Sequence, residues 1–257
     1  MTLLSIQNLS VAFSGLQAIG DVSFDVDRGE IVGLIGPNGA GKSTLMNCLS
    51  GVCTPQVGRV LFDGHNVLDV SIDRIVRLGV ARTFQNIELF GQSTAAENVL
   101  IGCMWKYRPG LLAEILGLPQ ARAAYSRAAA DVETILKTLK LDPIRNSRVS
   151  ELAFGTQKMI ELARALAAQP RLLLLDEPAA GLNSRESLQL GDFLRQLRDR
   201  EGMAVLLVEH DMPLVMKICD RIVVLDHGEV ICQGSPAEVR QNTQVIASYL
   251  GDEVLDA

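Results

Sequence analysis

The chain has 257 residues, 48% of them hydrophobic and 21% charged, and a formal net charge of −6. A chain of this length buries roughly 70 to 75% of its unfolded surface, so its core needs neither a disulfide nor a structural metal. The negative charge argues against a nucleic-acid partner, because nucleic-acid-binding proteins usually carry an excess of Lys and Arg on one face. No apolar run reaches the ~18 to 20 residues that span a bilayer, and the first ten residues do not have the pattern of a secretory leader, so we expect the chain in the cytoplasm.

The cysteines are odd in number and include no C-x-x-C pair. They lie in apolar surroundings, which is typical of buried free thiols in a reducing compartment. We therefore expect five buried free thiols, at Cys48, Cys53, Cys103, Cys219 and Cys232.

The first segment, residues 3–26, alternates short apolar runs with glycines and predicts antiparallel strands joined by short turns. Phe13 lies in this segment. An aromatic residue at this place can stack on an adenine ring, although an aromatic residue in a strand more often belongs to the core.

The next run, residues 31–35, is apolar and β-branched and predicts a buried strand. It leads into G-P-N-G-A-G-K-S-T, which has the G-x-x-x-x-G-K-[ST] spacing of a phosphate-binding P-loop between a strand and a helix. The alternative is a glycine-rich turn that only happens to precede a helix. We expect a nucleoside triphosphate with Mg²⁺ in contact with the whole loop: Gly36, Pro37, Asn38, Gly39, Ala40, Gly41, Lys42, Ser43 and Thr44.

Each residue type in this loop has a physical reason. Glycine lets the backbone turn tightly and approach an anion, so that successive N–H groups and the helix N-terminus converge on phosphate. Lys42 would reach the β- and γ-phosphates, and the Ser43 hydroxyl would complete the shell of a magnesium ion.

After this loop a helix should end near Gly51, followed by a strand over 59–63, a helix over 71–78 and a strand over 80–84. Residues 86–150 carry no strand signal. Two helices are expected there, over 97–105 and 121–141, with a loop punctuated by Pro109, Gly110, Gly117 and Pro119 between them. We interpret this block as a helical insert.

From residue 154 strands and helices alternate again. A helix with Met159 and Leu162 on its apolar face comes first. The remaining expected elements are strands over 171–175, 204–208, 221–225 and 229–232, helices over 184–200 and 212–219, and a last helix capped by Ser235.

Asp176 and Glu177 directly follow the buried strand 171–175. The carboxyl ends of parallel strands are where such sheets bind ligands, so Asp176 would hold Mg²⁺ through water and Glu177 would polarise the attacking water. Taken alone, the L-L-L-L-D-E pattern could also be a strand that ends in a surface turn.

Gln85 and His210 each follow an apolar strand and would emerge at the same edge as Asp176. A glutamine there can coordinate Mg²⁺ and the attacking water, and a histidine can donate a hydrogen bond to the γ-phosphate. The alternatives are an exposed polar residue at a strand end and a structural histidine.

The order of these segments resembles the ATP-binding-cassette (ABC) ATPases from end to end: the P-loop, Gln85, the helical block, L-A-F-G-T-Q-K at 152–158, L-L-L-L-D-E-P, A-G-L-N at 180–183 and V-E-H-D. The match looks closest to the ATP-binding subunits of bacterial high-affinity branched-chain amino-acid importers. Supporting segments are R-T-F-Q-N-I-E-L-F, the long insert, D-E-P-A-A-G-L-N, E-H-D-M and the Y-L-G at 249–251.

This resemblance implies an α/β fold: a P-loop NTPase core with a mainly parallel sheet, an N-terminal antiparallel β-subdomain and an inserted α-helical subdomain. It implies one cassette domain over 1–257, with the core at 1–85 and 157–257 and the helical subdomain with the signature motif at 86–156.

The resemblance also assigns roles to residues. Phe13 looks like the aromatic that stacks on adenine. The segment Ala153, Phe154, Gly155 and Thr156 looks like the cassette signature, which in this family binds the γ-phosphate of ATP held by a partner subunit.

Three positions depart from the usual family pattern. Ala153 stands where Ser is usual, Thr156 where Gln is usual, and Asn183, which resembles the loop residue that communicates between the two ATP sites, where Asp is usual. These departures leave open whether two composite sites would be equally active.

The implied function is ATP hydrolysis with Mg²⁺, coupled to import. The implied partners are a second ATP-binding cassette, integral membrane permease subunits and, indirectly, a periplasmic or extracellular solute-binding protein, at the cytoplasmic face of the plasma membrane. Alternatives are the ATPase of a lipid or lipopolysaccharide exporter and a soluble cassette ATPase outside transport. A GTPase is disfavoured because the chain has no N-K-x-D segment, and a small-molecule kinase because Glu177 beside Asp176 suits water activation.

Overall fold

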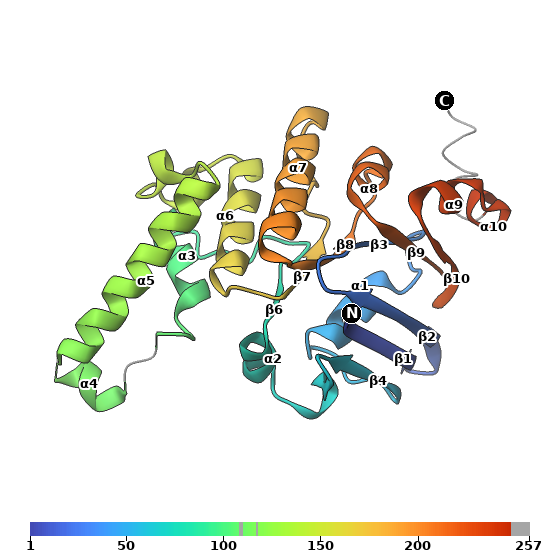
Figure 1. Cartoon of the computed structure of the whole chain (residues 1–257), viewed down its shortest axis with the longest axis horizontal. Coiled ribbons are helices and arrows are strands. Elements are labelled where there is room, and N and C mark those ends of the chain that lie inside the picture. The colour runs from blue at the N-terminus through green and yellow to red at the C-terminus, as the bar shows by residue number, and fades with distance from the viewer. Residues whose placement is uncertain (108–109, 117, 248–257) are drawn as a thin grey trace. The chain divides into compact units, whose positions relative to one another are not determined.

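The computed structural model describes residues 1–107, 110–116 and 118–247. Contacts within the chain divide it into two units, one formed by residues 1–82 with the segment from 171 onward and the other by residues 83–170 (Figure 1). Pro109 and Gly117 of the expected loop, and the Y-L-G segment 249–251, lie outside the described residues.

The first unit contains a four-stranded antiparallel sheet in the order β2-β1-β4-β5. Its strands are β1 (Thr2–Phe13), β2 (Leu16–Asp27), β4 (Val57–Phe62) and β5 (His65–Asn66). Ser14 and Gly15 between β1 and β2, and Asp63 and Gly64 between β4 and β5, all have positive φ, as two-residue hairpin turns of type I′ require. The expected antiparallel strands at the start of the chain are therefore confirmed.

The second sheet of this unit has six strands in the order β10-β9-β3-β8-β7-β6. It is parallel except for β10, which pairs antiparallel with β9. Its strands are β3 (Ile31–Ile35), β6 (Val80–Arg82), β7 (Leu172–Asp176), β8 (Ala204–Val208), β9 (Arg221–Asp226) and β10 (Glu229–Gly234). All residues of β3, β7 and β8 are buried, which explains why these strands read as continuous apolar runs.

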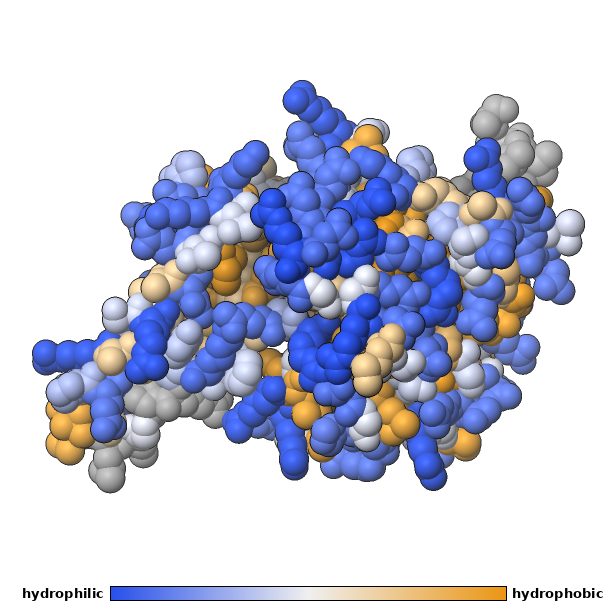
Figure 2. Space-filling view, viewed as in Figure 1, coloured by the Kyte–Doolittle hydropathy of each residue, from blue (hydrophilic) through white to orange (hydrophobic). Residues whose placement is uncertain are grey.

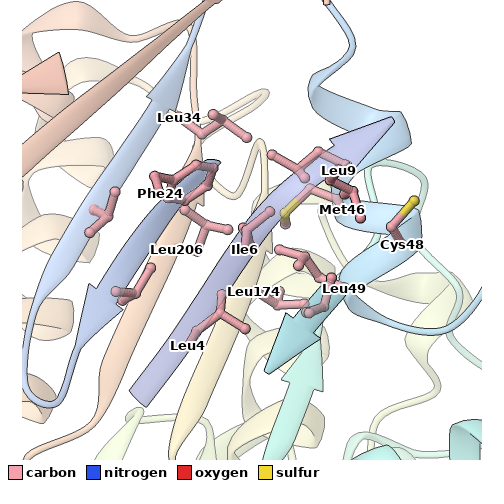
Figure 3. Packing of buried hydrophobic residues seen from close by; sticks show 14 of the residues in the cluster. Leu4, Ile6, Leu9, Phe24, Leu34, Met46, Cys48, Leu49, Leu174 and Leu206 are labelled. Carbon is pink, nitrogen blue, oxygen red and sulfur yellow. The ribbon is translucent and has the colours of Figure 1, made fainter. Parts of the chain in front are cut away.

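Helix α1 (Lys42–Leu49) lies with the antiparallel sheet on one face of the six-stranded sheet, and α7 (Ser184–Glu201) and α8 (Met212–Ile218) lie on the other (Figure 1). Figure 3 shows how the apolar side chains of the two sheets and α1 meet in one core. The labelled members are Leu4, Ile6 and Leu9 of β1, Phe24 of β2, Leu34, Leu174 and Leu206 of the parallel sheet, and Met46, Cys48 and Leu49 of α1. This core holds α1 in place and thereby positions the loop that leads into α1.

The outer helices of this unit begin at defined caps. Asn183 caps α7 and forms a reciprocal capping box with Glu186, and the outward face of α7 is hydrophilic (Figure 2). Ser235 caps α9 (Pro236–Gln241), as expected. The other elements are the 3₁₀ turn η1 (Val67–Asp69), α2 (Ile72–Leu78) and α10 (Thr243–Val245).

The second unit is helical. It comprises α3 (Ala95–Cys103), α4 (Leu111–Ile115), α5 (Pro119–Thr138), the 3₁₀ turns η2 (Asp142–Ile144) and η3 (Val149–Glu151), and α6 (Phe154–Ala167). Across its described residues there is no named strand, only an isolated bridge between Thr94 and Arg148. Helix α3 starts two residues before the expected range because Thr94 and Glu97 form a capping box. By contacts α6 belongs to this unit, whereas the sequence pattern placed the return to the core at residue 157.

All five cysteines are free, but the expectation that all are buried is wrong for two of them. Cys53 lies in the loop after α1, and Cys232 lies on the edge strand β10, so both are only partly buried. Across the part of the chain that the structure describes, no helix combines the length and apolar character needed to cross a membrane.

Candidate active site

The loop between β3 and α1 is shaped by glycines that no larger residue could replace. Gly36 and Gly41 have φ of 151° and 101°. A Cβ added at Gly36 would lie 2.0 Å from the carbonyl oxygen of Leu225, and a Cβ added at Gly41 would lie 2.5 Å from the carbonyl oxygen of Ala18. The loop backbone is therefore pressed against β9 and β2, and it leads directly into the N-terminus of α1. This is a cradle of the kind in which backbone N–H groups bind phosphate.

Lys42 closes this loop. Its Nζ donates hydrogen bonds to the carbonyl oxygens of Gly36 and Pro37 at 2.6 and 2.9 Å, and the side chain is buried. Burial lowers the pKa of Lys42, and the negative charges of Glu177 and Asp176 oppose this shift. The charge of the ammonium group is thus partly offset by both carboxylates.

Asp176 is the last residue of β7 and is buried. Its Oδ2 accepts a hydrogen bond from Nη2 of Arg82 at 3.0 Å. The sequence pattern did not predict a role for Arg82, and its position at the end of a strand was the only signal that could have indicated one.

Glu177, the next residue, has a φ of 49°, in the left-handed region that is unusual for a non-glycine residue. Its backbone N–H donates to the carbonyl oxygen of Val208 at 2.9 Å, which ties it to the end of β8. His210 follows β8, and its Nε2 lies 3.1 Å from Oε1 of Glu177. A strained backbone of this kind is common where a side chain is aimed at a functional site.

Glu209 holds the loops after β7 and β8 together, and the sequence reading gave it no role. Its buried carboxylate accepts hydrogen bonds from the backbone N–H groups of Ala179, His210 and Asp211 at 2.6, 3.1 and 3.4 Å. Burial raises its pKa, although these hydrogen bonds oppose the rise. The only sequence signal was an acidic residue inside E-H-D at the end of an apolar strand.

Phe13 lies at the end of β1, before the hairpin turn, and is 52% exposed. Its ring is therefore not part of the core, which removes the structural alternative that the sequence left open. An exposed ring can stack on a base.

The remaining expected site residues lie in the second unit. Ala153 is the N-cap of α6, and no side-chain hydrogen bond caps this end. Phe154, Gly155 and Thr156 form its first turn, and Phe154 is half exposed. The backbone carbonyl of Gln85 accepts a hydrogen bond from Lys158 of α6 at 2.8 Å. Within this unit the Gln85 segment is thus bonded to the helix that the signature segment begins.

The donor set of the first unit suits a magnesium ion bound together with a nucleotide. Among the described residues, no three or more His, Cys, Asp or Glu side chains gather into a metal cage. Magnesium needs only one or two protein oxygens when phosphate and water complete its shell, and the Ser43 hydroxyl and the Asp176 carboxylate are of the hard oxygen type it prefers.

Comparison with known families assigns the class. The family described as "ABC transporter" matches residues 19–180, and the family described as "Branched-chain amino acid ATP-binding cassette transporter" matches residues 229–254. The chain therefore belongs to the ABC transporter family.

More narrowly, the chain is similar over nearly its whole length to branched-chain amino-acid transport ATP-binding proteins. It is 41% identical to the high-affinity branched-chain amino acid transport ATP-binding protein LivG of Escherichia coli K12, over 97% of this chain and 98% of that protein. It is 39% identical to BraF of Pseudomonas aeruginosa, with the same coverage.

Solved structures agree on the fold. A nucleotide-free ATP-binding cassette from an ABC transporter superposes with a TM-score of 0.85 at 27% identity, over 97% of this chain and 99% of that one. The ADP conformation of the cassette MJ1267 gives a TM-score of 0.82 at 29% identity, over 98% of this chain and 99% of that one. The expected fold class, with one antiparallel and one mainly parallel sheet, is confirmed.

Proposed function

We propose that this chain is the ATP-hydrolysing subunit of a bacterial importer for branched-chain amino acids, working as one cassette domain over residues 1–257. The observation that carries the proposal is the phosphate cradle with Lys42, Asp176 and Glu177 beside it, in a chain that is 41% identical to LivG over 97% of its length. The similarity to LivG and BraF supports the substrate class.

ATP is the proposed substrate, and a related cassette has been solved in an ADP conformation. Phosphate oxygens would replace the carbonyl oxygens of Gly36 and Pro37 as acceptors of the hydrogen bonds from Lys42 Nζ. Residues 36–44 would surround the phosphates. The exposed ring of Phe13 would stack on adenine. Magnesium, when bound, neutralises phosphate charge, and Ser43, Asp176 and Gln85 are the residues proposed to hold it.

Hydrolysis needs a water oriented for in-line attack on the γ-phosphate. Glu177 is the proposed base, and its constrained backbone aims the carboxylate. His210 contacts that carboxylate and would donate to the γ-phosphate, so it orients both reacting partners. Gln85 would contact the metal and the attacking water.

Each site is proposed to be completed by a second cassette. The signature segment, Ala153 to Thr156, begins α6, and the N-terminus of a 14-residue helix carries a partial positive charge that suits the partner's γ-phosphate. A related cassette, MJ0796, has been solved as a dimer in a post-hydrolysis state with ADP and Pi; it superposes with a TM-score of 0.78 at 26% identity, over 91% of this chain and 99% of that one. Asn183, the cap of α7, is proposed to communicate between the two sites.

The further partners are integral membrane permease subunits, through which the chain would sit peripherally at the cytoplasmic face of the plasma membrane, and a solute-binding protein that delivers the amino acid. Nucleic acid is not a proposed partner. Closure of the two cassettes on ATP would drive the permeases.

The test is reconstitution of the chain with permease subunits and the solute-binding protein of a branched-chain amino-acid importer. Proteoliposomes that enclose ATP and the cassettes, with the binding protein and leucine outside, should accumulate leucine. The Glu177→Gln variant should bind to the permeases but support no uptake. ATP hydrolysis without amino-acid uptake, or movement of lipid instead, would contradict the importer and favour a lipid exporter. Hydrolysis by a chain that binds no permease would favour a cassette ATPase outside transport.

A further inference from the structure

Arg82 ends β6 and makes a buried ion pair with Asp176. The guanidinium Nη2 lies 3.0 Å from Oδ2 of Asp176, and the two side chains are 7% and 5% exposed. Strands β6 and β7 are parallel neighbours, so this contact joins residues that are 94 positions apart in the sequence. A buried guanidinium is costly without an anionic partner, and the pair therefore fixes both side chains.

The same guanidinium also bonds to α1. Its Nη1 donates to Oδ1 of Asn47 at 2.7 Å and to Oγ of Ser50 at 2.8 Å. Ser50 in turn donates to the carbonyl oxygen of Met46 at 2.8 Å, so its hydroxyl is held in place. The planar fork of arginine suits such bridging of three oxygens, whereas lysine is a single point charge.

These contacts lie on the face of α1 that begins at the phosphate loop. Ser43, Asn47 and Ser50 are spaced at i, i+4 and i+7, so they share one face of the helix and its cap. Ser43, at the top of this face, and Asp176, at the end of β7, are the two residues of the first unit proposed to hold magnesium. Arg82 therefore links the two elements that carry them.

We propose that Arg82 is a positioning residue for magnesium: by bonding Asp176 and the Ser43 face of α1 together, it sets where the carboxylate stands relative to the phosphate loop. Magnesium demands near-ideal octahedral geometry at about 2.0 to 2.1 Å, so a small displacement of either element weakens its binding. Residues that orient metal-holding groups typically contribute roughly 10- to 100-fold to metal affinity. This inference rests on the proposed ATP site.

A purely structural role for the same pair makes a different prediction. If Arg82 only neutralised the buried charge of Asp176, its loss would lower the stability of the chain. It would then weaken nucleotide binding equally with and without magnesium. The informative quantity is therefore the ratio of the two nucleotide affinities, with magnesium and without it.

The experiment titrates the full chain with the non-hydrolysable ATP analogue AMPPNP in MgCl₂ and in EDTA. We expect Arg82→Met to reduce the magnesium-dependent gain in affinity by roughly ten-fold or more, with a smaller effect in EDTA. Arg77→Met is the matched control, because Arg77 lies exposed on α2, where it pairs with Asp73, and it should keep the gain of the unaltered chain.

An unchanged ratio for a folded Arg82→Met variant overturns the inference. Should that variant fail to fold by circular dichroism, Arg82→Lys decides. Lysine keeps the charge but carries all its N–H donors on one nitrogen, so it cannot reproduce the fork that bonds Asp176 through Nη2 and α1 through Nη1. A full magnesium gain in this variant also overturns the inference. If the unaltered chain binds no AMPPNP under either condition, the proposed function itself fails.

Discussion

His210 and Glu177 come from loops that follow two adjacent parallel strands, and they meet with Nε2 of the histidine 3.1 Å from Oε1 of the glutamate. The backbone of Glu177 is bonded to Val208 and has a positive φ, so the direction in which its side chain leaves the backbone is fixed. Glu177 is the base proposed for hydrolysis, and a base held in this way would lose less entropy when the attacking water binds.

The first prediction concerns this carboxylate. Glu177→Gln should slow ATP hydrolysis by a factor of about 10² to 10⁴, because the amide keeps the shape of the side chain but accepts no proton. ATP binding and ATP-driven dimerisation should persist, as measured by nucleotide titration and light scattering. Glu229→Gln, at an exposed position on β10, is the control and should hydrolyse ATP normally. Unchanged turnover in Glu177→Gln would show that another residue orients the water.

The second prediction concerns the lysine of the phosphate loop. Lys42→Ala removes both the charge proposed to meet the β- and γ-phosphates and the two hydrogen bonds that close the loop on itself. We expect nucleotide affinity to fall by about ten-fold or more, since a hydrogen bond to a charged group is worth roughly 1.5 to 3 kcal/mol. Equilibrium titration with ATP measures it, with Lys140→Ala, at an exposed position after α5, as the control. Equal affinities for the two variants would contradict the proposed role.

The fully buried strands were predictable because their apolar runs are bounded by turns. The expected strands 31–35 and 204–208 coincide with β3 and β8. Element ends were less predictable where a side chain decides them. Helix α3, for example, starts at the capping box of Thr94 and Glu97.

The contacts of the site could not be predicted, because they depend on strand order. The sequence placed polar residues at strand ends, but the sheet order β8-β7-β6 is what brings His210 to Glu177 and Arg82 to Asp176. The positive φ of Glu177 likewise follows from its backbone bond to β8, and no local residue pattern signals it.

The third prediction tests the proposed adenine contact. Phe13→Ala should weaken ATP binding by roughly 1 to 3 kcal/mol, the usual contribution of one base stacked on an aromatic ring. Phe13 is 52% exposed, so the melting temperature should change little. Affinities for ATP and for inorganic triphosphate separate the base from the phosphates, since only the former should fall. Leu16→Ala, on the other side of the hairpin turn, is the control; a loss equal to that of Phe13→Ala would argue against stacking.

The fourth prediction concerns pH and the buried carboxyl of Glu209. Burial raises its pKa above the ordinary value of 4.5, and Asp211 adds to the rise, while hydrogen bonds from three backbone N–H groups act against it. A carboxyl with a higher pKa in the folded chain binds its proton more tightly there. Its contribution to stability is therefore fully present below the unfolded pKa and is lost as pH rises through the folded pKa.

Glu209→Gln removes this titration. As pH rises from about the pKa of Glu209 in the unfolded chain, the free energy of unfolding of the unaltered chain should fall more steeply than that of the variant. The extra loss is about 1.4 kcal/mol for each pH unit that separates the folded from the unfolded pKa of Glu209. Urea unfolding at a series of pH values measures both curves. Glu201→Gln, at the exposed end of α7, is the control and should follow the unaltered chain. Parallel curves for the unaltered chain and Glu209→Gln would show that the folded structure does not shift this carboxyl, and that its three backbone hydrogen bonds offset its burial completely.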